Sequence, residues 1–218
     1  PKQFMSLRKT WVRLKSIPKQ LQQTLIVAED GRFFQHKGLD WHEINHAWQQ
    51  NIERGRIVRG GSTITQQLAR NFFLSNEKTF TRKIKEAFLA LRIEREFSKQ
   101  EILELYMNKI FLGYRAYGVG AAAEVYYGRS PDQLSLAQCA RIAALPKAPS
   151  RINPITSPER AVERRNYVLS RMIELGYIDR EAHYRAAGYR DLGEGAFTAR
   201  QRRLDTPSIM AAPPHLRS

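Results

Sequence analysis

The sequence predicts a mainly α fold, and two observations carry that prediction. Helix start and stop signals divide most of the 218 residues into segments of helical length. Alternating patterns typical of strands are scarce, and the best short candidate is 56–59. Because 42% of the residues are apolar, the chain can bury one sizeable core or the cores of two small lobes.

Two helices are expected in the first quarter of the chain. Pro18 suits a first helical position, so we expect a helix over 19–29. Asp40 with Glu43 forms a capping-box pattern, so a second helix is expected from there to about Arg54. The stop signals are Gly31 and Gly55.

Later helix starts are marked by residues whose oxygens can cap a first turn. Ser62 is expected to cap a helix that carries Gln67, and Thr79 or Thr81 to cap one that carries Glu86. Further starts are expected at Ser98 with Glu101, Ser130 with Gln133, Ser157 and Asp179. Glycines break up the aromatic-rich stretch 111–127, which predicts a compact helix with turns.

The composition changes near the end of the chain. After Gly188 the residues are mainly Gly, Arg, Pro and Ser, with Pro213 and Pro214 close to the end. Such a segment buries too little apolar surface to fold on its own. We therefore expect one folded domain over 1–190 and a mobile tail, or the start of a linker, over 191–218.

The formal charge of +15 and the pI of about 10.2 predict an anionic partner. Nucleic acid is not expected, because acids are interleaved with the cations and no recognition module or long basic tail is present. An anionic membrane surface and a pyrophosphate remain as candidate partners. No apolar run approaches the ~20 residues that span a bilayer. Because the chain opens at Pro1 rather than Met, we expect a fragment whose anchoring helix lay upstream.

A single cysteine excludes an internal disulfide. Cys139 lies in an apolar run and is expected to be a small core residue. The oxidising or reducing character of its compartment stays open, because a domain of this size needs no disulfide in either.

Two glutamates lie in settings that suit neither burial nor plain solvation. Glu29 ends its expected helix, where the macrodipole is negative, and Asp30 follows directly, so both features disfavour the ionised form. A carboxylate with raised proton affinity suits a general base. Glu86 shares a helix face with aliphatic residues and has Arg82 four residues earlier, so we expect it to be semi-buried beside that cation. The alternative for Glu29 is an ordinary polar helix end, and the alternative for Glu86 is a structural ion pair with Arg82.

Between the glutamates lies a segment rich in hydroxyl and amide groups, residues 60–71. Its serine, threonine and glutamine side chains can bind sugar or phosphate oxygens without adding charge. Together with the carboxylates and cations on either side, this segment indicates glycosyl chemistry on an anionic substrate.

The stretch from His42 to His46 matches the zinc-binding pattern H-E-x-x-H. Zinc would need a third ligand, for which the sequence offers only His183, His215 and unpatterned carboxylates. Glu43 already has a local role as the partner of Asp40. We therefore predict no metal site.

In order along the chain, these motifs resemble those of the family-51 peptidoglycan glycosyltransferases, also called transglycosylases. Members occur alone or as the first catalytic domain of class A penicillin-binding proteins. The resemblance covers about 17–188 and rests on five motifs: Glu29, Asp30, Phe33, His36 and Gly38; Gly60 and 62–67, with Asn71; Arg82, Lys83 and Glu86; Lys99, Ile102, Leu103, Tyr106 and Asn108; Arg164, Arg165, Val168 and Leu169. No transpeptidase motif follows, so the chain is either the first domain of such an enzyme or a natural truncation.

The resemblance implies a mainly α, lysozyme-like fold with a head lobe, a membrane-facing jaw lobe and a cleft between them. It implies a peptidoglycan glycosyltransferase domain over 1–190 that polymerises lipid II into β-1,4 glycan strands by inverting transfer, with release of undecaprenyl pyrophosphate. It also implies sensitivity to the donor-site inhibitor moenomycin. The expected location is the outer (periplasmic) face of the bacterial inner membrane, among other cell-wall synthesis proteins.

On this resemblance, Glu29 is the general base on the acceptor hydroxyl and Glu86 belongs to the leaving-group side. The implied substrate-binding residues are Asp30, Phe33, His36, Ser62, Thr63, Gln67, Asn71, Arg82, Lys83 and Lys99. No cofactor is required, and a divalent cation, Mg or Mn, is optional.

Two other functions are alternatives to glycan polymerisation, and the sequence also predicts a membrane-facing surface. A lysozyme-like hydrolase or lytic transglycosylase would cleave finished glycan, and a catalytically dead module would only bind membrane or cell wall. A lip on the membrane interface is expected from Phe72, Phe73, Leu74 and Phe80 with Lys78 and Arg82, and core packing is the alternative for each aromatic side chain.

Overall fold

The computed structural model describes residues 11–53, 61–73, 79–152 and 154–188. Over these residues the structure is helical, and the nearest approach to a strand is an isolated bridge between Phe111 and Tyr117. The mainly α prediction is confirmed for this part of the chain. The strand candidate 56–59 and the predicted tail 191–218 lie outside the described residues.

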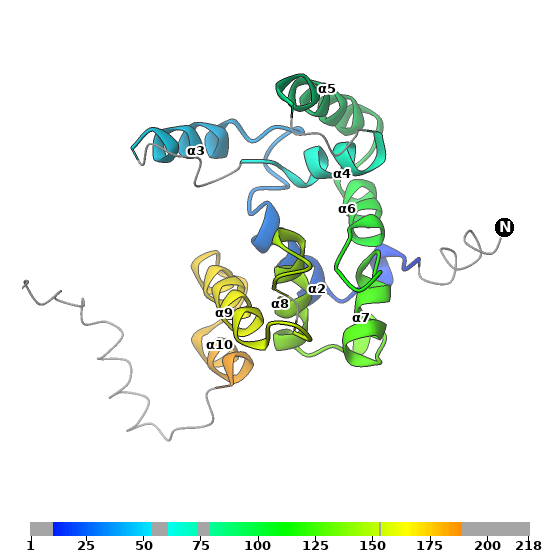
Figure 1. Ribbon diagram of the computed structural model, residues 1–218, viewed down its shortest axis with the longest axis vertical. Helices are drawn as coiled ribbons and strands as arrows, with labels where there is room; N and C mark the ends of the chain where they lie inside the picture. The colour runs from blue at the N-terminus through cyan, green and yellow to red at the C-terminus, as the bar shows by residue number, and fades with distance from the viewer. Residues whose placement is uncertain (1–10, 54–60, 74–78, 153, 189–218) are drawn as a thin grey trace, which may run out of the picture.

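The helices follow one another along the chain in the order that Figure 1 shows. The α-helices are α2 (Lys19–Glu29), α3 (Trp41–Glu53), α4 (Ile64–Phe73), α5 (Phe80–Glu96), α6 (Lys99–Lys109), α7 (Val119–Tyr127), α8 (Leu136–Ala144), α9 (Pro158–Glu174) and α10 (Arg180–Ala187). Short 3-10 turns are η1 (Leu14–Ser16), η2 (Pro131–Gln133) and η3 (Leu145–Lys147).

The described helices form two lobes (Figure 1). The α5 lobe holds α3, α4 and α5, and the α2 lobe holds α2, α8, α9 and α10. Within the α2 lobe, α2 packs on α8 and α9, and α10 packs on α9; within the α5 lobe, α4 packs on α5. Helix α6 contacts α4 and α5, and it also contacts α7, which packs on α8, so α6 and α7 together join the lobes. The predicted two-lobed, helical architecture is confirmed.

One hydrophobic core runs through both lobes. Its buried members include Leu21 and Leu25 of α2, Ile64 and Leu68 of α4, Ile102, Leu103 and Met107 of α6, and Val168, Leu169 and Met172 of α9. Cys139 of α8 is fully buried in the same core, as predicted. Because α2, α4 and α6 share this close-packed core, side chains at their ends are held in fixed relative positions.

Most predicted helix starts are confirmed. Thr79 rather than Thr81 caps α5, accepting a hydrogen bond from the Arg82 amide. Asp40 accepts from two amides in the first turn of α3. A capping box opens α6 at Ser98 with Glu101, and Asp179 caps α10. The box at Ser130 with Gln133 opens only the 3-10 turn η2, and α8 has its own box at Ser135 with Gln138, which was not predicted.

The predicted cap at Ser62 is wrong by one residue. The cap of α4 is Thr63, whose hydroxyl accepts from the Gln66 amide at 3.1 Å while the Gln66 side chain accepts from the Thr63 amide at 3.0 Å. This reciprocal pair is a capping box, and it satisfies donors that the first helical turn leaves unpaired. The hydroxyl of Ser62 is thereby left for a contact with Lys83.

Gly38 fixes the connection between α2 and α3 against α5. Its φ of +91° is in the region that favours glycine, and a Cβ there would lie 3.0 Å from the carbonyl oxygen of Ala90. The Gly38 carbonyl in turn accepts a hydrogen bond of 2.6 Å from the hydroxyl of Thr63. The loop after α2 is therefore bound to the start of α4 and to the side of α5.

No helix among the described residues has both the length and the hydropathy that crossing a bilayer requires.

Candidate active site

Glu29 is the last residue of α2 and is half-buried. Its Oε2 accepts a hydrogen bond of 2.9 Å from Nε2 of Gln67, which lies one turn into α4. Burial raises the pKa of Glu29, while the Gln67 bond and the charges of Arg164, Lys147 and Arg70 lower it; the balance is a raised pKa. The predicted direction is confirmed, but its largest cause is burial rather than the neighbouring Asp30.

Asp30 joins the loop after α2 to the start of α4. Its Oδ2 accepts from the backbone amide of Ile64 at 2.9 Å, at the positive end of the α4 dipole. Both of its carboxylate oxygens lie 3.0 Å from Nε2 of His36. The side chain of Asp30 is almost fully buried, so these bonds fix where α4 begins relative to Glu29.

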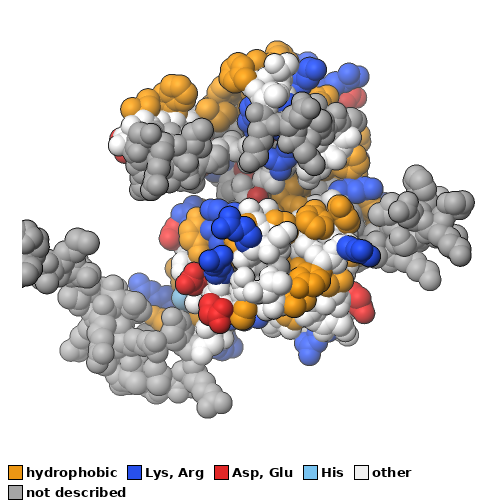
Figure 2. All heavy atoms as spheres, viewed as in Figure 1, with side chains coloured by type: hydrophobic (Ala, Val, Ile, Leu, Met, Phe, Trp, Pro, Cys, Tyr) orange, Lys and Arg blue, Asp and Glu red, His pale blue; other side chains and the backbone are white. Residues whose placement is uncertain are grey.

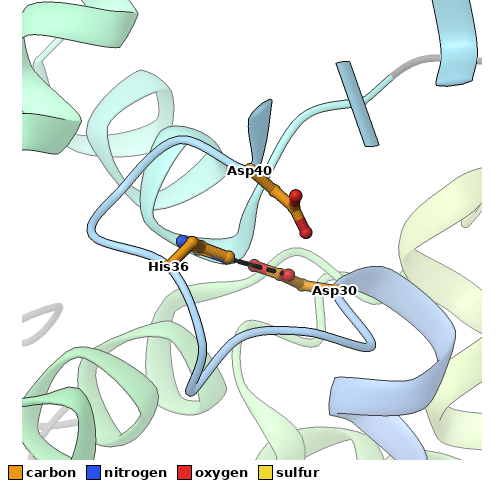
Figure 3. Close-up of side chains that lie close together, drawn as sticks. All are labelled: Asp30, His36 and Asp40. Atoms are coloured by element: carbon orange, nitrogen blue, oxygen red, sulfur yellow. Dashed lines mark hydrogen bonds and ion pairs between the residues drawn. The ribbon is translucent and has the colours of Figure 1, made fainter. Parts of the chain in front are cut away.

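Asp30, His36 and Asp40 offer ligand atoms within 4.8 Å of one another, which raises the question of a metal site (Figure 3). The Nδ1 atom of His36 accepts a hydrogen bond from the Gly38 amide at 3.2 Å, so the ring carries its proton on Nε2, facing Asp30. A cation at Nε2 would have to displace the His36–Asp30 hydrogen bond. Oδ1 of Asp40 accepts from the α3 amides, whereas its Oδ2 lies 3.5 Å from Nε of Arg32 without a hydrogen bond. The cluster fits a role in ordering the loop better than metal binding.

Glu86 is buried in α5 between two cations, with 1% of its surface exposed. Its Oε2 pairs with Nη1 of Arg82 at 2.8 Å, and its Oε1 pairs with Nζ of Lys83. Lys83 also donates to the hydroxyl of Ser62 at 2.7 Å, and 44% of its side chain remains exposed. The carboxylate of Glu86 therefore holds two cations in place, and these carry a net positive charge as a group.

The segment from Ser62 to Gln67 contacts both glutamate sites. At one end, Ser62 accepts from Lys83, which is bound to Glu86. At the other end, Gln67 donates to Glu29. One stretch of chain thus places a carboxylate able to take a proton and a pair of cations able to meet a developing negative charge. Acid–base chemistry with departure of an anionic group is the reaction class that this arrangement suits.

A sequence model of the family described as Transglycosylase matches residues 2–173. This chain belongs to the transglycosylase family. It is 52% identical over 185 residues to penicillin-binding protein 1A of Pseudomonas aeruginosa and 56% identical over 179 residues to penicillin-binding protein 1A of Escherichia coli. Those alignments cover 85% and 82% of this chain, but only 22% and 21% of the relatives.

This chain also resembles a protein of Cupriavidus necator that is named as a transglycosylase candidate and is covered over most of its length. The two are 49% identical over 170 residues, which cover 78% of this chain and 73% of the relative. Among solved structures, penicillin-binding protein 1A of Haemophilus influenzae is 45% identical, with a TM-score of 0.41 over 57% of this chain and 15% of that one.

Two side chains predicted to bind substrate in this transglycosylase are instead part of its interior. Phe33 is fully buried, with Nζ of Lys99 lying 4.3 Å from its ring centroid. Thr63 is 2% exposed and uses its hydroxyl to cap α4 and to bind Gly38. In this conformation both side chains support the site through internal contacts, and their contact with substrate stays a prediction.

Lys99 has an internal partner as well, since its ammonium group donates to Glu94 at 2.7 Å and most of its side chain is covered. Thr65 donates to the same carboxylate. Of the remaining predicted substrate-binding residues, Asp30 and His36 lie in the loop network described above. Those with accessible surface are Ser62, Gln67, Asn71 and Lys83, whereas the Arg82 side chain is as covered as that of Lys99.

Four residues near Glu29 were not predicted as site residues: Arg70, Tyr106, Lys147 and Arg164. Arg70 has a local signal, because it follows Gln67 by three positions and so shares its helix face. Lys147 and Arg164 come from η3 and α9, and only the folded chain brings their charges to bear on Glu29. Tyr106 of α6 and Arg164 lie in the fourth and fifth motifs of the resemblance, but neither was assigned a role at Glu29.

The H-E-x-x-H stretch forms part of α3, where His42 and His46 are exposed. Among the described residues, the one cluster with metal-ligand spacing excludes both of them. His183 lies in α10, and His215 is outside the described residues. The stretch therefore lacks a third ligand in the part of the chain that the structure describes.

Proposed function

We propose that this chain is a peptidoglycan glycosyltransferase that polymerises lipid II into β-1,4 glycan strands by inverting transfer, with release of undecaprenyl pyrophosphate. One observation carries the proposal: the segment Ser62 to Gln67 joins a half-buried carboxylate of raised pKa to a pair of cations. Family membership gives the reaction class, and the chain spans about a fifth of the length of the penicillin-binding proteins 1A that it matches.

In this reaction Glu29 removes the proton from the 4-hydroxyl of the acceptor sugar. The acceptor oxygen forms a bond to the anomeric carbon of the donor strand, and the bond from that carbon to the pyrophosphate oxygen breaks. A single displacement of this kind inverts the anomeric centre. Arg82 and Lys83, held by Glu86, neutralise the charge that grows on the departing pyrophosphate, where fixed cations stabilise a transition state most.

The accessible polar side chains of the site bind the sugar and phosphate oxygens. Ser62, Gln67 and Asn71 carry the hydroxyl and amide groups suited to this role. No nucleotide or other cofactor is required, because the pyrophosphate carrier is itself an activated leaving group. A divalent cation, Mg or Mn, remains optional on the leaving-group side.

The α5 lobe has the surface expected of a protein that works on a membrane-bound substrate. Figure 2 shows hydrophobic side chains along the outer edges of α3 and α5. They are Trp41, Trp48 and Ile52 on α3, and Phe80, Ile84 and Phe88 on α5. On each helix the spacing places the three on one stripe. Of the predicted lip, Phe72 and Phe80 are exposed, and the side chains of Phe73, Leu74 and Lys78 lie outside what the structure describes.

These apolar stripes, together with the formal charge of +15, favour docking on an anionic membrane. We place the domain on the periplasmic face of the inner membrane, where lipid II, the growing glycan strand and other cell-wall synthesis proteins would be its partners.

The test is incubation of the purified protein with labelled lipid II, with and without moenomycin, and separately with finished peptidoglycan. Long glycan strands from lipid II that moenomycin suppresses are expected, with no soluble fragments from peptidoglycan. Fragment release without polymer would replace the proposal by a hydrolase or lytic transglycosylase. Binding to either substrate without turnover would replace it by a binding module.

A further inference from the structure

Tyr106 ends a hydrogen-bonded chain that begins at Glu29. It lies in α6, is fully buried, and donates through its hydroxyl to Oε1 of Gln67 at 2.9 Å. The other end of the same carboxamide, Nε2, donates to Glu29 at 2.9 Å. The Gln67 side chain therefore bridges a phenol on α6 and a carboxylate at the end of α2.

A carboxamide has an accepting end and a donating end, and rotation by half a turn exchanges them. An ionised carboxylate only accepts, so it needs the donating end of Gln67. The hydroxyl of Tyr106 at the opposite end holds the accepting oxygen away from Glu29. Without that donor, the oxygen of Gln67 can turn toward Glu29 and oppose its ionised form.

We propose that Tyr106 is a positioning residue whose hydroxyl fixes which end of the Gln67 carboxamide faces Glu29. The inference rests on the proposed function in one respect, the role of Glu29 as the general base. It assigns Tyr106 no contact with substrate and no proton transfer.

The surroundings of Tyr106 keep it a donor. Burial raises the pKa of Tyr106 well above its ordinary value, and the charge of Glu29 raises it further, whereas Arg70 lowers it and Asp30 raises it. The hydroxyl therefore keeps its proton throughout the working range of pH, and the direction of its bond to Gln67 does not change.

Three other charged groups of the described residues act on Glu29, and none of them lies on α6 with Tyr106. Arg164 belongs to α9, Lys147 to η3 and Arg70 to α4, and all three favour the ionised carboxylate. Replacing Tyr106 by Phe leaves these charges in place and removes one hydroxyl. A change in the titration of Glu29 in that variant can thus be attributed to the carboxamide.

The experiment is the pH dependence of lipid II polymerisation by Tyr106→Phe. The acid limb of the kcat/KM profile is expected to move up by about half to one pH unit, because the weakened Gln67 bond favours protonated Glu29. The rate at high pH should stay within a few-fold of the original chain. A uniform loss at all pH values with an unmoved limb would show a merely structural role and overturn the inference.

Tyr126→Phe is the matched control. The hydroxyl of Tyr126 donates to the backbone carbonyl of Leu112 at 2.7 Å, so this variant also loses one hydroxyl with one internal bond. A lower melting temperature with an unmoved acid limb is expected. A limb that moves equally in both variants would overturn the inference, since the shift would then follow any loss of a tyrosine hydroxyl.

A second readout separates this inference from the proposed function. The carboxyl carbon of Glu29 is titrated by NMR in the original chain and in Tyr106→Phe, and a higher pKa in the variant is expected whatever the activity. If Glu29→Gln abolishes polymerisation but the Glu29 pKa is equal in both proteins, the inference fails and the proposed function stands. If Glu29→Gln remains active, the assignment of Glu29 as the general base fails, and the titration still decides the role of Tyr106.

Should Tyr106→Phe fold poorly, the same titration on Gln67→Leu tests the premise that the Gln67 carboxamide lowers the pKa of Glu29. That variant lacks the carboxamide, so a raised Glu29 pKa is expected. An unchanged value would remove the premise and overturn the inference.

Discussion

The carboxamide of Gln67 donates to the carboxylate of Glu29 at 2.9 Å, although the two residues are 38 positions apart in the chain. The contact depends on where α4 begins. Asp30 binds the first amide of α4, and Thr63 at its cap binds the carbonyl of Gly38. Two residues therefore hold α4 in place beside Glu29: Asp30, which follows Glu29 in the sequence, and Thr63, which caps α4.

Asp30→Asn is expected to destabilise the fold and to reduce activity. The amide keeps one accepting oxygen but loses the charge that binds the α4 amide and His36, a loss of about 1–3 kcal/mol for a buried charged acceptor. Urea unfolding measures the change in the free energy of unfolding. Asp132→Asn, at an exposed aspartate in η2, is the control and should be neutral. Equal midpoints for the two variants would contradict the anchoring role.

Lys83→Ala is expected to lower kcat/KM for lipid II by about 10²-fold, the typical effect of removing one group that stabilises a developing anion. The neighbouring Lys85→Ala removes the same charge from the exposed face of α5 and should have little effect. Initial rates at fixed ionic strength make the comparison. Similar losses in both variants would point to general membrane attraction instead of a localised cation.

Glu29→Gln is expected to be at least as stable as the original chain at neutral pH. The pKa of Glu29 is raised from its ordinary 4.5 in the folded state, so the folded chain holds this proton more tightly than the unfolded chain does. Stability is therefore lost as pH rises from about 4.5 through the folded pKa, and the full penalty applies above it. Glutamine carries no such penalty.

Thermal unfolding across pH checks this sign. The melting temperature of the variant minus that of the original should increase with pH above about 4.5 and level off once Glu29 is ionised in both states. A difference that increases toward acid pH would contradict the raised pKa.

Cys139 is expected to react with a thiol reagent only after unfolding. Burial raises the pKa of its thiol from 9.0 to about 12, which lowers the thiolate fraction at pH 8 on the order of 10³-fold. Its side chain is also fully covered. Reaction with an aromatic disulfide in native buffer and in denaturant measures the ratio. Rapid reaction in native buffer would show that α8 is not packed as described.

Local signals in the sequence were enough to predict the helices and most of their caps. The expected helix 19–29 coincides with α2, because helix ends depend on neighbouring residues. Ser62 and Thr63 could not be told apart as caps, since both carry hydroxyls and only the contact of Ser62 with Lys83 separates their roles. The buried position of Phe33 was likewise invisible, because an aromatic residue in a motif can equally line a site or fill a core.

Contacts between distant segments were beyond sequence reasoning. Gln67 could be expected near a substrate, but its pairing with Glu29 and Tyr106 requires α2, α4 and α6 to converge. The charges of Lys147 and Arg164 reach Glu29 only through the packing of the α2 lobe. Such relationships depend on the tertiary fold, which no local pattern contains.

The most direct test is the rate of lipid II polymerisation by Glu29→Gln. Glutamine keeps the size of the side chain and an oxygen for the Gln67 bond but cannot take a proton. The account predicts a loss on the order of 10²- to 10⁴-fold, with the folded structure retained by circular dichroism and melting temperature. A variant that keeps most of its rate would contradict the assignment of Glu29 as the base.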